Sequence, residues 1–331
     1  MKKLTRRVFM TGSAAVHDRI VWGDTAAEQQ ARRLRSEPRV AKPITSELGC
    51  VTPVIVVPGA WSEAETRYQA ENVATMVAHN ASCNCNAAKV LVTWSKWPLR
   101  AAFLDRVGEA LDWCRVRPPY YPGAVAKQRT FVDAYPDAAR VRSTDDGKLP
   151  YVTIFGLDSS TCDRRVFTEE AWSPVLAETP LEAGDDAEFV DTAVRFCNER
   201  IEGSLSIMLL ASAPSRQRLG PHFDGAVHDL RYGTIAVNHW SAVSFALAVA
   251  PWGAYPGHAL QSVGSGIGFV HNTRMFDRPL KTVLTAPFVT RPKPVWFATN
   301  ARAERVARLM VRFEAAPSWR QVPAIVASAM L

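Results

Sequence analysis

Two kinds of hydrophobic pattern alternate along this chain. Continuous runs of aliphatic and β-branched residues, which predict strands buried on both faces, occur at residues 54–57, 89–93, 205–210 and 234–238. After the first of these runs, apolar positions recur every three or four residues, which predicts helices over residues 63–79, 99–113, 186–200, 223–230 and 300–314. Residues 24–36, before the first run, are predicted to form a polar, basic helix. This alternation predicts an α/β fold, with a parallel-rich sheet flanked by helices.

Local signals place some of the boundaries between these elements. Asp24 is a plausible N-cap for the first predicted helix, and Pro58-Gly59 ends the first predicted strand. Residues 115–150 are rich in Pro, Tyr, Asp and Arg and are expected to be irregular. Glycine and proline crowd residues 251–268, which predicts a shaped loop there.

Composition narrows the class of protein. The chain has 331 residues, 47% of them hydrophobic, which suffices for a large core and about two domains. The net charge of +7 is scattered, and no basic stretch interleaves with aromatic residues, so we expect no nucleic-acid partner. The longest apolar runs, residues 205–213 and 242–251, are too short to span a membrane.

Six cysteines over this length do not form a disulfide framework and fit a reducing cytoplasm. Residues 5–10 resemble a twin-arginine export signal, but the apolar region that such a signal needs is interrupted by His17, Asp18 and Arg19. Cys83, Cys85 and nearby His79 supply at most three ligands where structural zinc needs four. We therefore expect a cytoplasmic protein without a metal site.

The segment around Cys83 and Cys85 carries the candidate chemistry. Four polar side chains, those of Asn80, Ser82, Asn84 and Asn86, flank the two thiols, which weighs against a purely apolar pocket. Glu47 lies upstream, just before a predicted strand. A thiol and a carboxylate that takes its proton are the minimal pair for covalent chemistry on a carbonyl. The alternative is two small core thiols and a solvated glutamate.

Five motifs, in order, resemble those of the aldehyde dehydrogenase superfamily. Residues 9–13 resemble the family's Phe-Thr-Gly-Ser turn, residues 47–49 its Glu-Leu-Gly-Gly, and residues 80–85 its Asn-x-Gly-Gln-x-Cys. Residues 169–175 resemble its Glu-Glu-Ile-Phe-Gly-Pro-Val, and residues 251–254 with 265–268 resemble its Pro-Phe-Gly-Gly with Ser-Gly-x-Gly. Cys85 stands five residues after Asn80, as the family's nucleophile does, whereas Cys83 takes the place of its glutamine. Each motif alone is weak, but five in the right order are specific.

The resemblance implies oxidation of a small aldehyde to a carboxylic acid with NAD or NADP, through a thiohemiacetal and a thioester. It implies that Cys85 is the nucleophile, Glu47 the general base, and Trp252 a lining residue of the aldehyde tunnel. The cofactor-binding residues that it implies are Gly12, Ser13, Glu170 and Trp172. A coenzyme-A-acylating relative would share the nucleophile but does not need Glu47.

By the same resemblance, residues 1–47 are the remnant of a cofactor domain that is otherwise absent, 48–280 form the catalytic domain, and 281–331 supply a subunit-pairing strand and a helical tail. This implies a homo-oligomer with no membrane partner. Two hypotheses follow: a shortened aldehyde dehydrogenase with an intact catalytic domain, or a non-catalytic fragment or pseudoenzyme that retains only oligomerisation. The particular aldehyde and the choice between NAD and NADP stay open.

Overall fold

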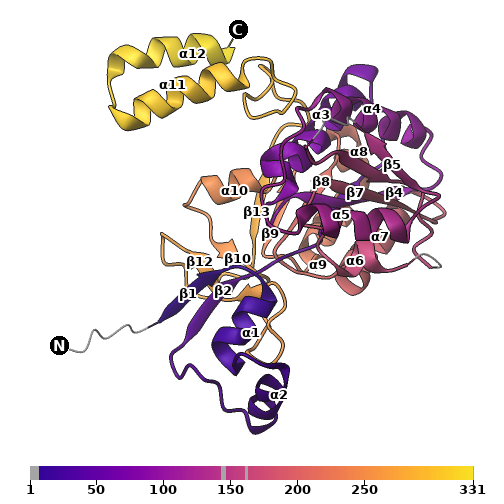
Figure 1. The fold of residues 1–331 in the computed structure, drawn as a ribbon. Helices are drawn as coiled ribbons and strands as arrows, with labels where there is room; N and C mark the ends of the chain where they lie inside the picture. Colours follow the sequence, from indigo (N-terminus) through magenta and orange to yellow (C-terminus); the bar gives the residue numbers. More distant parts are fainter. Residues whose placement is uncertain (1–6, 143–146, 161–162, 331) are drawn as a thin grey trace.

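The computed structural model describes residues 7–142, 147–160 and 163–330, and its central element is an eight-stranded sheet (Figure 1). The strands lie in the order β13-β9-β8-β3-β4-β7-β6-β5, and all neighbours run parallel except β5 and β6. Their bounds are β3 (Thr52–Val56), β4 (Ala88–Trp94), β5 (Ala139–Arg142), β6 (Tyr151–Ile154), β7 (Val175–Leu181), β8 (Ser206–Leu210), β9 (Thr234–Val237) and β13 (Thr282–Thr285). The predicted α/β fold with a parallel-rich sheet is confirmed.

Helices cover both faces of this sheet, as the continuous apolar strands require. On β3, Val54 and Val56 pack against the face covered by α3 (Glu63–Ala78) and α4 (Arg100–Trp113), while Ile55 packs on the opposite face. The helices of that opposite face are α5 (Ala124–Ala134), α6 (Arg165–Thr168), α7 (Asp186–Arg200), α8 (Ala213–Leu219) and α9 (Pro221–Asp229). The region expected to be irregular, residues 115–150, therefore contains α5 and β5.

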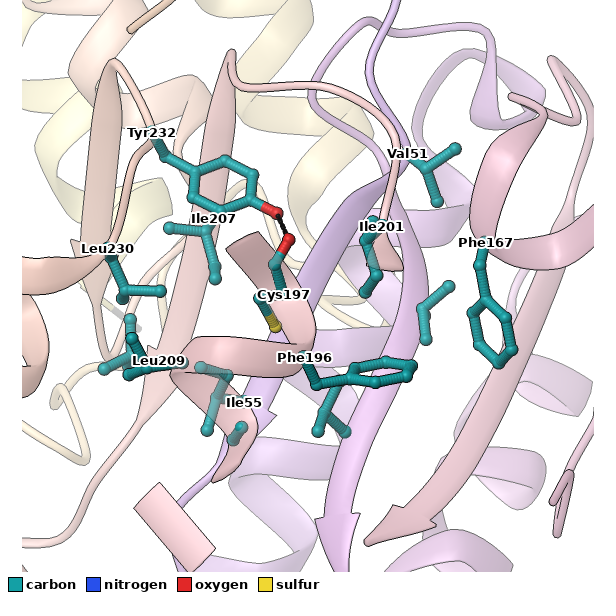
Figure 2. Packing of buried hydrophobic residues seen from close by; sticks show 14 of the residues in the cluster. Val51, Ile55, Phe167, Phe196, Cys197, Ile201, Ile207, Leu209, Leu230 and Tyr232 are labelled. Carbon is teal, nitrogen blue, oxygen red and sulfur yellow. Dashed lines mark hydrogen bonds between the residues drawn. The ribbon is translucent and has the colours of Figure 1, made fainter. Parts of the chain in front are cut away.

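Figure 2 shows the packing on the α7 face. Phe196 and Cys197 of α7 lie against side chains of β3 and β8, and the Tyr232 hydroxyl donates a hydrogen bond to the Cys197 carbonyl at 2.9 Å. Burial in this apolar layer raises the pKa of the Cys197 thiol well above its usual range. Cys197 is thus a packing residue.

A smaller layer is built mainly from the N-terminal residues, before the first strand of the main sheet. It consists of a three-stranded sheet in the order β1-β2-β11 with two helices, and its bounds are β1 (Val8–Thr11), α1 (Ala14–Trp22), α2 (Ala26–Arg35), β2 (Ile44–Glu47) and β11 (Gly266–Ile267). The predicted N-cap Asp24 is wrong, because Thr25 caps α2: its hydroxyl accepts the Glu28 N–H at 3.2 Å. Asp24 instead forms an ion pair with Arg39 at 2.7 Å.

The last third of the chain adds β11 to the small sheet and β13 to the main sheet, and then forms a helical hairpin. β10 (Trp252–Gly253) and β12 (Phe269–His271) pair antiparallel after α10 (Ala242–Ala246), and β13 pairs with β9 of its own chain at the sheet edge. The helices α11 (Ala303–Ala315) and α12 (Val322–Met330), with a short 3₁₀ turn (Trp319–Gln321) between them, form a hairpin that extends from the body (Figure 1). No described helix is long and apolar enough to cross a membrane.

Candidate active site

Glu47 is the last residue of β2 and is held on both sides by backbone pairing. Its strand pairs in parallel with β1 and antiparallel with β11, and the Glu47 carbonyl also accepts the Gly12 N–H at 3.0 Å. At Gly266, φ is +135° and an added Cβ would lie 2.0 Å from the Ser46 carbonyl oxygen, so only glycine allows this close approach. Glu47, held in this way, is 3% exposed.

Cys85 enters the site from the opposite layer. It lies between a 3₁₀ turn (His79–Ser82) and the strand β4, and the Thr52 hydroxyl donates to its carbonyl at 3.3 Å. Its Sγ donates a hydrogen bond to Glu47 Oε1 at 2.9 Å. The thiol and carboxylate that the sequence singles out are therefore in direct contact, although 38 residues separate them.

The surroundings of Cys85 keep its thiol protonated. Burial raises the pKa of Cys85 most, and the charge and hydrogen bond of Glu47 raise it further, as does Glu170. Ionising the sulfur would place two anions 2.9 Å apart. When this sulfur attacks a carbonyl carbon, its proton can pass to Glu47 Oε1, which is the acceptor in position to take it.

The neighbouring thiols lie in different settings. Cys83 is buried, and its Sγ donates to the Trp172 carbonyl at 3.5 Å, which ties two loops together. Cys50 is 2% exposed and its Sγ faces the Ser206 carbonyl at 3.9 Å. Burial raises the pKa of both thiols. Of these three cysteines, only Cys85 donates its thiol proton to a carboxylate.

Two ionisable groups near this site, Lys89 and Glu170, lie within range of each other's charge. The Lys89 ammonium, on a side chain 4% exposed, donates to the Ser82 carbonyl at 3.0 Å, the Ser82 hydroxyl at 2.8 Å and the Ser173 carbonyl at 3.2 Å. Burial lowers the pKa of Lys89 to about 8 and raises the pKa of Glu170 to about 7, while the attraction between them opposes both shifts. Among the described residues, Glu170 Oε1 has no hydrogen-bond partner, although it is buried.

Glu47, Cys85 and Glu170 line one cavity of about 1060 Å³ between the two layers. Its walls include Thr11, Gly12, Ser13, Ala14, Ala15, Glu47, Leu48, Gly49, Cys50, Val51, Cys85, Tyr121, Thr168, Glu169, Glu170, Trp172, Glu202 and Gly264. Six of the seven predicted site residues therefore meet here. The seventh, Trp252, is 1% exposed and packs edge-to-face on Phe245, so the structure does not bring it to this cavity.

Two features of the cavity suit a polar, phosphate-bearing ligand. The N-terminus of α1 opens into it at Gly12 and Ser13, and the first N–H groups of a helix have no partner within the helix and attract anions. An added Cβ at Gly49 would lie 2.2 Å from Glu170 Oε2, so this glycine leaves room for the carboxylate. No described group of three or more His, Cys, Asp or Glu side chains could hold a metal ion.

Sequence patterns did not predict two residues of this region, the wall residue Tyr121 and the buried Lys89. Tyr121 lies edge-to-face against Trp172, with ring centroids 5.6 Å apart, although its segment has no periodicity that predicts a role. Lys89 carried a usable signal, because a lysine inside a continuous apolar strand is rarely buried without partners.

The sequence matches no family model and no curated protein. Solved structures with this fold include an indole-3-acetaldehyde dehydrogenase with NAD+ (19% identity, TM-score 0.55, 83% of this chain and 50% of that one). AldH from Staphylococcus aureus in a substrate-bound state (18%, 0.57, 81% and 52%) and lactaldehyde dehydrogenase from Escherichia coli (17%, 0.56, 81% and 51%) are similar. The chain thus has the aldehyde dehydrogenase fold, and it spans about half the length of these proteins.

Proposed function

We propose that this chain carries the catalytic centre for NAD- or NADP-dependent oxidation of a small aldehyde to a carboxylic acid. The observation that carries the proposal is the 2.9 Å contact between Cys85 Sγ and Glu47 Oε1 on the wall of the cavity. The similarity to aldehyde dehydrogenase structures, one of them a complex with NAD+, supports the reaction class.

The two side chains account for both halves of such a reaction. Cys85 Sγ adds to the aldehyde carbon while its proton moves to Glu47 Oε1, which avoids a free thiolate beside a carboxylate. Glu47 must then release this proton to solvent before the second half, in which it takes a proton from a water molecule that attacks the acyl carbon; the C–S bond breaks, the acid leaves, and the proton returns to Sγ. Backbone N–H groups near Cys85 are the candidate donors to the oxygen that becomes negative.

The residues around the cavity fit a nicotinamide dinucleotide. We propose that the start of α1, at Gly12 and Ser13, holds its phosphates through helix N–H groups other than those of Gly12 and Val16, which already donate to the Glu47 carbonyl and the Ser13 hydroxyl. We also propose that Glu170, with its unpartnered Oε1, binds a ribose hydroxyl beside Trp172. When bound there, the dinucleotide supplies the hydride acceptor.

Assembly and location follow as further parts of the proposal. β13 lies at the open edge of the main sheet, and an unpaired strand edge is a template for another chain. We propose that the protein forms a homo-oligomer through this edge. The five described cysteines are free, which fits the reducing cytoplasm.

The test is to measure reduced nicotinamide formed from an aldehyde and NAD+ or NADP+, and, in a separate incubation with and without the dinucleotide, to measure labelling of Cys85 by an aldehyde-like electrophile with peptide mass spectrometry. The expected result is an adduct on Cys85 and formation of reduced nicotinamide, both lost in Cys85→Ser and retained in the matched control Cys83→Ser. An adduct without dinucleotide response would favour a non-catalytic fragment, the alternative that the half-length match leaves open. No adduct on Cys85 would overturn the proposal.

A further inference from the structure

The segment that carries Cys85 has an unfavourable backbone. Three consecutive residues before it, Asn80, Ala81 and Ser82, have φ of 51°, 52° and 62°. Non-glycine residues rarely adopt this left-handed region, and Ala81 has no polar side chain to compensate locally. Such a conformation persists only where the surrounding structure fixes it. Contacts outside the segment 79–86 must therefore hold it.

Trp240, between β9 and α10, contacts both ends of this segment. Its ring stacks on the His79 imidazole, with centroids 5.2 Å apart and planes at 23°. Its indole Nε1 donates a hydrogen bond to the Asn86 carbonyl at 2.7 Å. Trp240 itself is 8% exposed within the core of the α3 and α4 face. One rigid side chain thus contacts the residue where the segment begins and the residue where it ends.

The C-terminal part of the chain completes the arrangement. The Trp296 carbonyl lies 2.6 Å from His79 Nε2, at hydrogen-bond distance, which fixes the ring that Trp240 stacks on. The hydrogen bonds from Asn80 to Asn84 and from Asn84 to the His79 carbonyl lie within the segment and move with it. Lys89 anchors the middle of the segment at Ser82.

We propose that Trp240 is a positioning residue for Cys85: by holding His79 and Asn86, it fixes the segment between them and so places Sγ against Glu47. Catalytic relevance rests on the proposed function, but the placement itself does not. Trp240 touches neither reacting group; it acts through the backbone of residues 79–86.

The test compares Trp240→Phe with a matched control, Trp97→Phe. Phenylalanine at 240 keeps a ring to stack on His79 but removes the N–H donor to Asn86. Trp97 is 3% exposed in the same core, and its indole also donates to a backbone carbonyl, that of Gly59, at 2.9 Å. Each variant is combined with Glu47→Gln, so that coupling between position 240 and Glu47 is measured in a double-mutant cycle.

Two readouts are used, hydrogen exchange of the peptide over residues 79–86 and the rate of Cys85 alkylation by iodoacetamide across pH. In Trp240→Phe we expect exchange in this peptide to be about tenfold faster and the effect of Glu47→Gln on alkylation to shrink several-fold. In Trp97→Phe both quantities should match the parent protein.

Equal behaviour of the two tryptophan variants, or an undiminished Glu47→Gln effect in Trp240→Phe, would overturn the positioning role. Neither readout requires aldehyde oxidation. Coupling between positions 240 and 47 in a protein that oxidises no aldehyde would therefore uphold the placement and defeat only the proposed function.

Discussion

The two layers that meet at the cavity differ in how they are held together. The main sheet is covered on both faces by large buried clusters, whereas the small N-terminal layer has a cluster of only Val21, Trp22 and Ile44, with partly buried neighbours. Apolar burial is the chief source of stability, so the two layers differ in their resistance to unfolding. Cys85 belongs to the well-packed layer and Glu47 to the weakly packed one. The contact between Cys85 and Glu47 therefore depends on the small N-terminal layer staying packed against the main sheet.

The largest effect is expected from a cavity in the well-packed layer. Phe189 of α7 is fully buried in the cluster on its face of the sheet. Phe189→Ala removes the ring and should lower the free energy of unfolding by about 3–5 kcal/mol. Denaturant titration followed by circular dichroism measures this. A loss below about 1 kcal/mol would contradict the view that this cluster holds the sheet.

The matching change in the small layer should act locally. Trp22 is 0% exposed, and its indole N–H donates to the Leu260 carbonyl at 3.3 Å. In Trp22→Ala we expect residues 8–47 to lose about 3 kcal/mol of hydrogen-exchange protection while β3 and β8 keep theirs. Mass-resolved exchange of peptides from both layers measures this. Equal loss in both would show a single cooperative unit.

How much the sequence predicts follows the same division. The strand at 54–57 and the helix at 186–200 are predicted because burial imposes a pattern on adjacent residues; the observed helix spans Asp186–Arg200. The small layer has too little core for such a pattern, and α1 escaped prediction. The contact of Glu47 with Cys85 joins two layers, so local pattern could not reveal it; the ordered motifs suggested it instead.

Which side chains line the cavity could not be predicted from the sequence pattern alone. Trp252 was expected to line a tunnel, yet its indole packs in the core, and Tyr121 from an aperiodic segment reaches the cavity. Hydrophobic pattern determines which residues are buried, but not whether a tryptophan faces a core or a pocket.

At the junction of the layers, Glu170 should make stability depend on pH. Its pKa is raised to about 7 from 4.5, mainly by burial, so the folded state holds this proton more tightly than the unfolded state. Its contribution to stability is complete below pH 4.5 and is lost as pH rises through 7. Between these limits, the stability of the parent protein relative to Glu170→Gln should fall by on the order of 3 kcal/mol.

Unfolding titrations of both proteins at several pH values measure this difference. Lys89 acts with the opposite sign, because its pKa is lowered to about 8: its contribution is complete above 10.5 and is lost as pH falls through 8. Its change therefore falls mainly above the window used for Glu170. Parallel stability curves for the two proteins between pH 4.5 and 7 would contradict the assignment.

The smallest expected effect is that of Glu47→Gln, which should change two rates in opposite directions: alkylation of Cys85 should become faster and aldehyde oxidation slower. Glu47→Gln removes the negative charge beside Cys85 but keeps an oxygen acceptor, so the raised pKa of the thiol should fall. More thiolate at a given pH should speed alkylation by iodoacetamide about tenfold, a change of about 1.4 kcal/mol. Aldehyde oxidation should slow at least 100-fold, since the proton acceptor of both half-reactions is gone.

The control is Glu202→Gln, which alters an exposed carboxylate on the same cavity wall. Solvent and salt screen exposed charges, so its effect on alkylation should stay within about twofold. Slower alkylation in Glu47→Gln would contradict this prediction, because it would mean that Glu47 takes the thiol proton during alkylation and that the raised pKa of the thiol does not limit this reaction. The final comparison combines Glu47→Gln with Trp22→Ala. If Glu47 contacts Cys85 only while the small layer is docked, Trp22→Ala alone should speed alkylation of Cys85 as Glu47→Gln does. Adding Glu47→Gln to Trp22→Ala should then change the alkylation rate little.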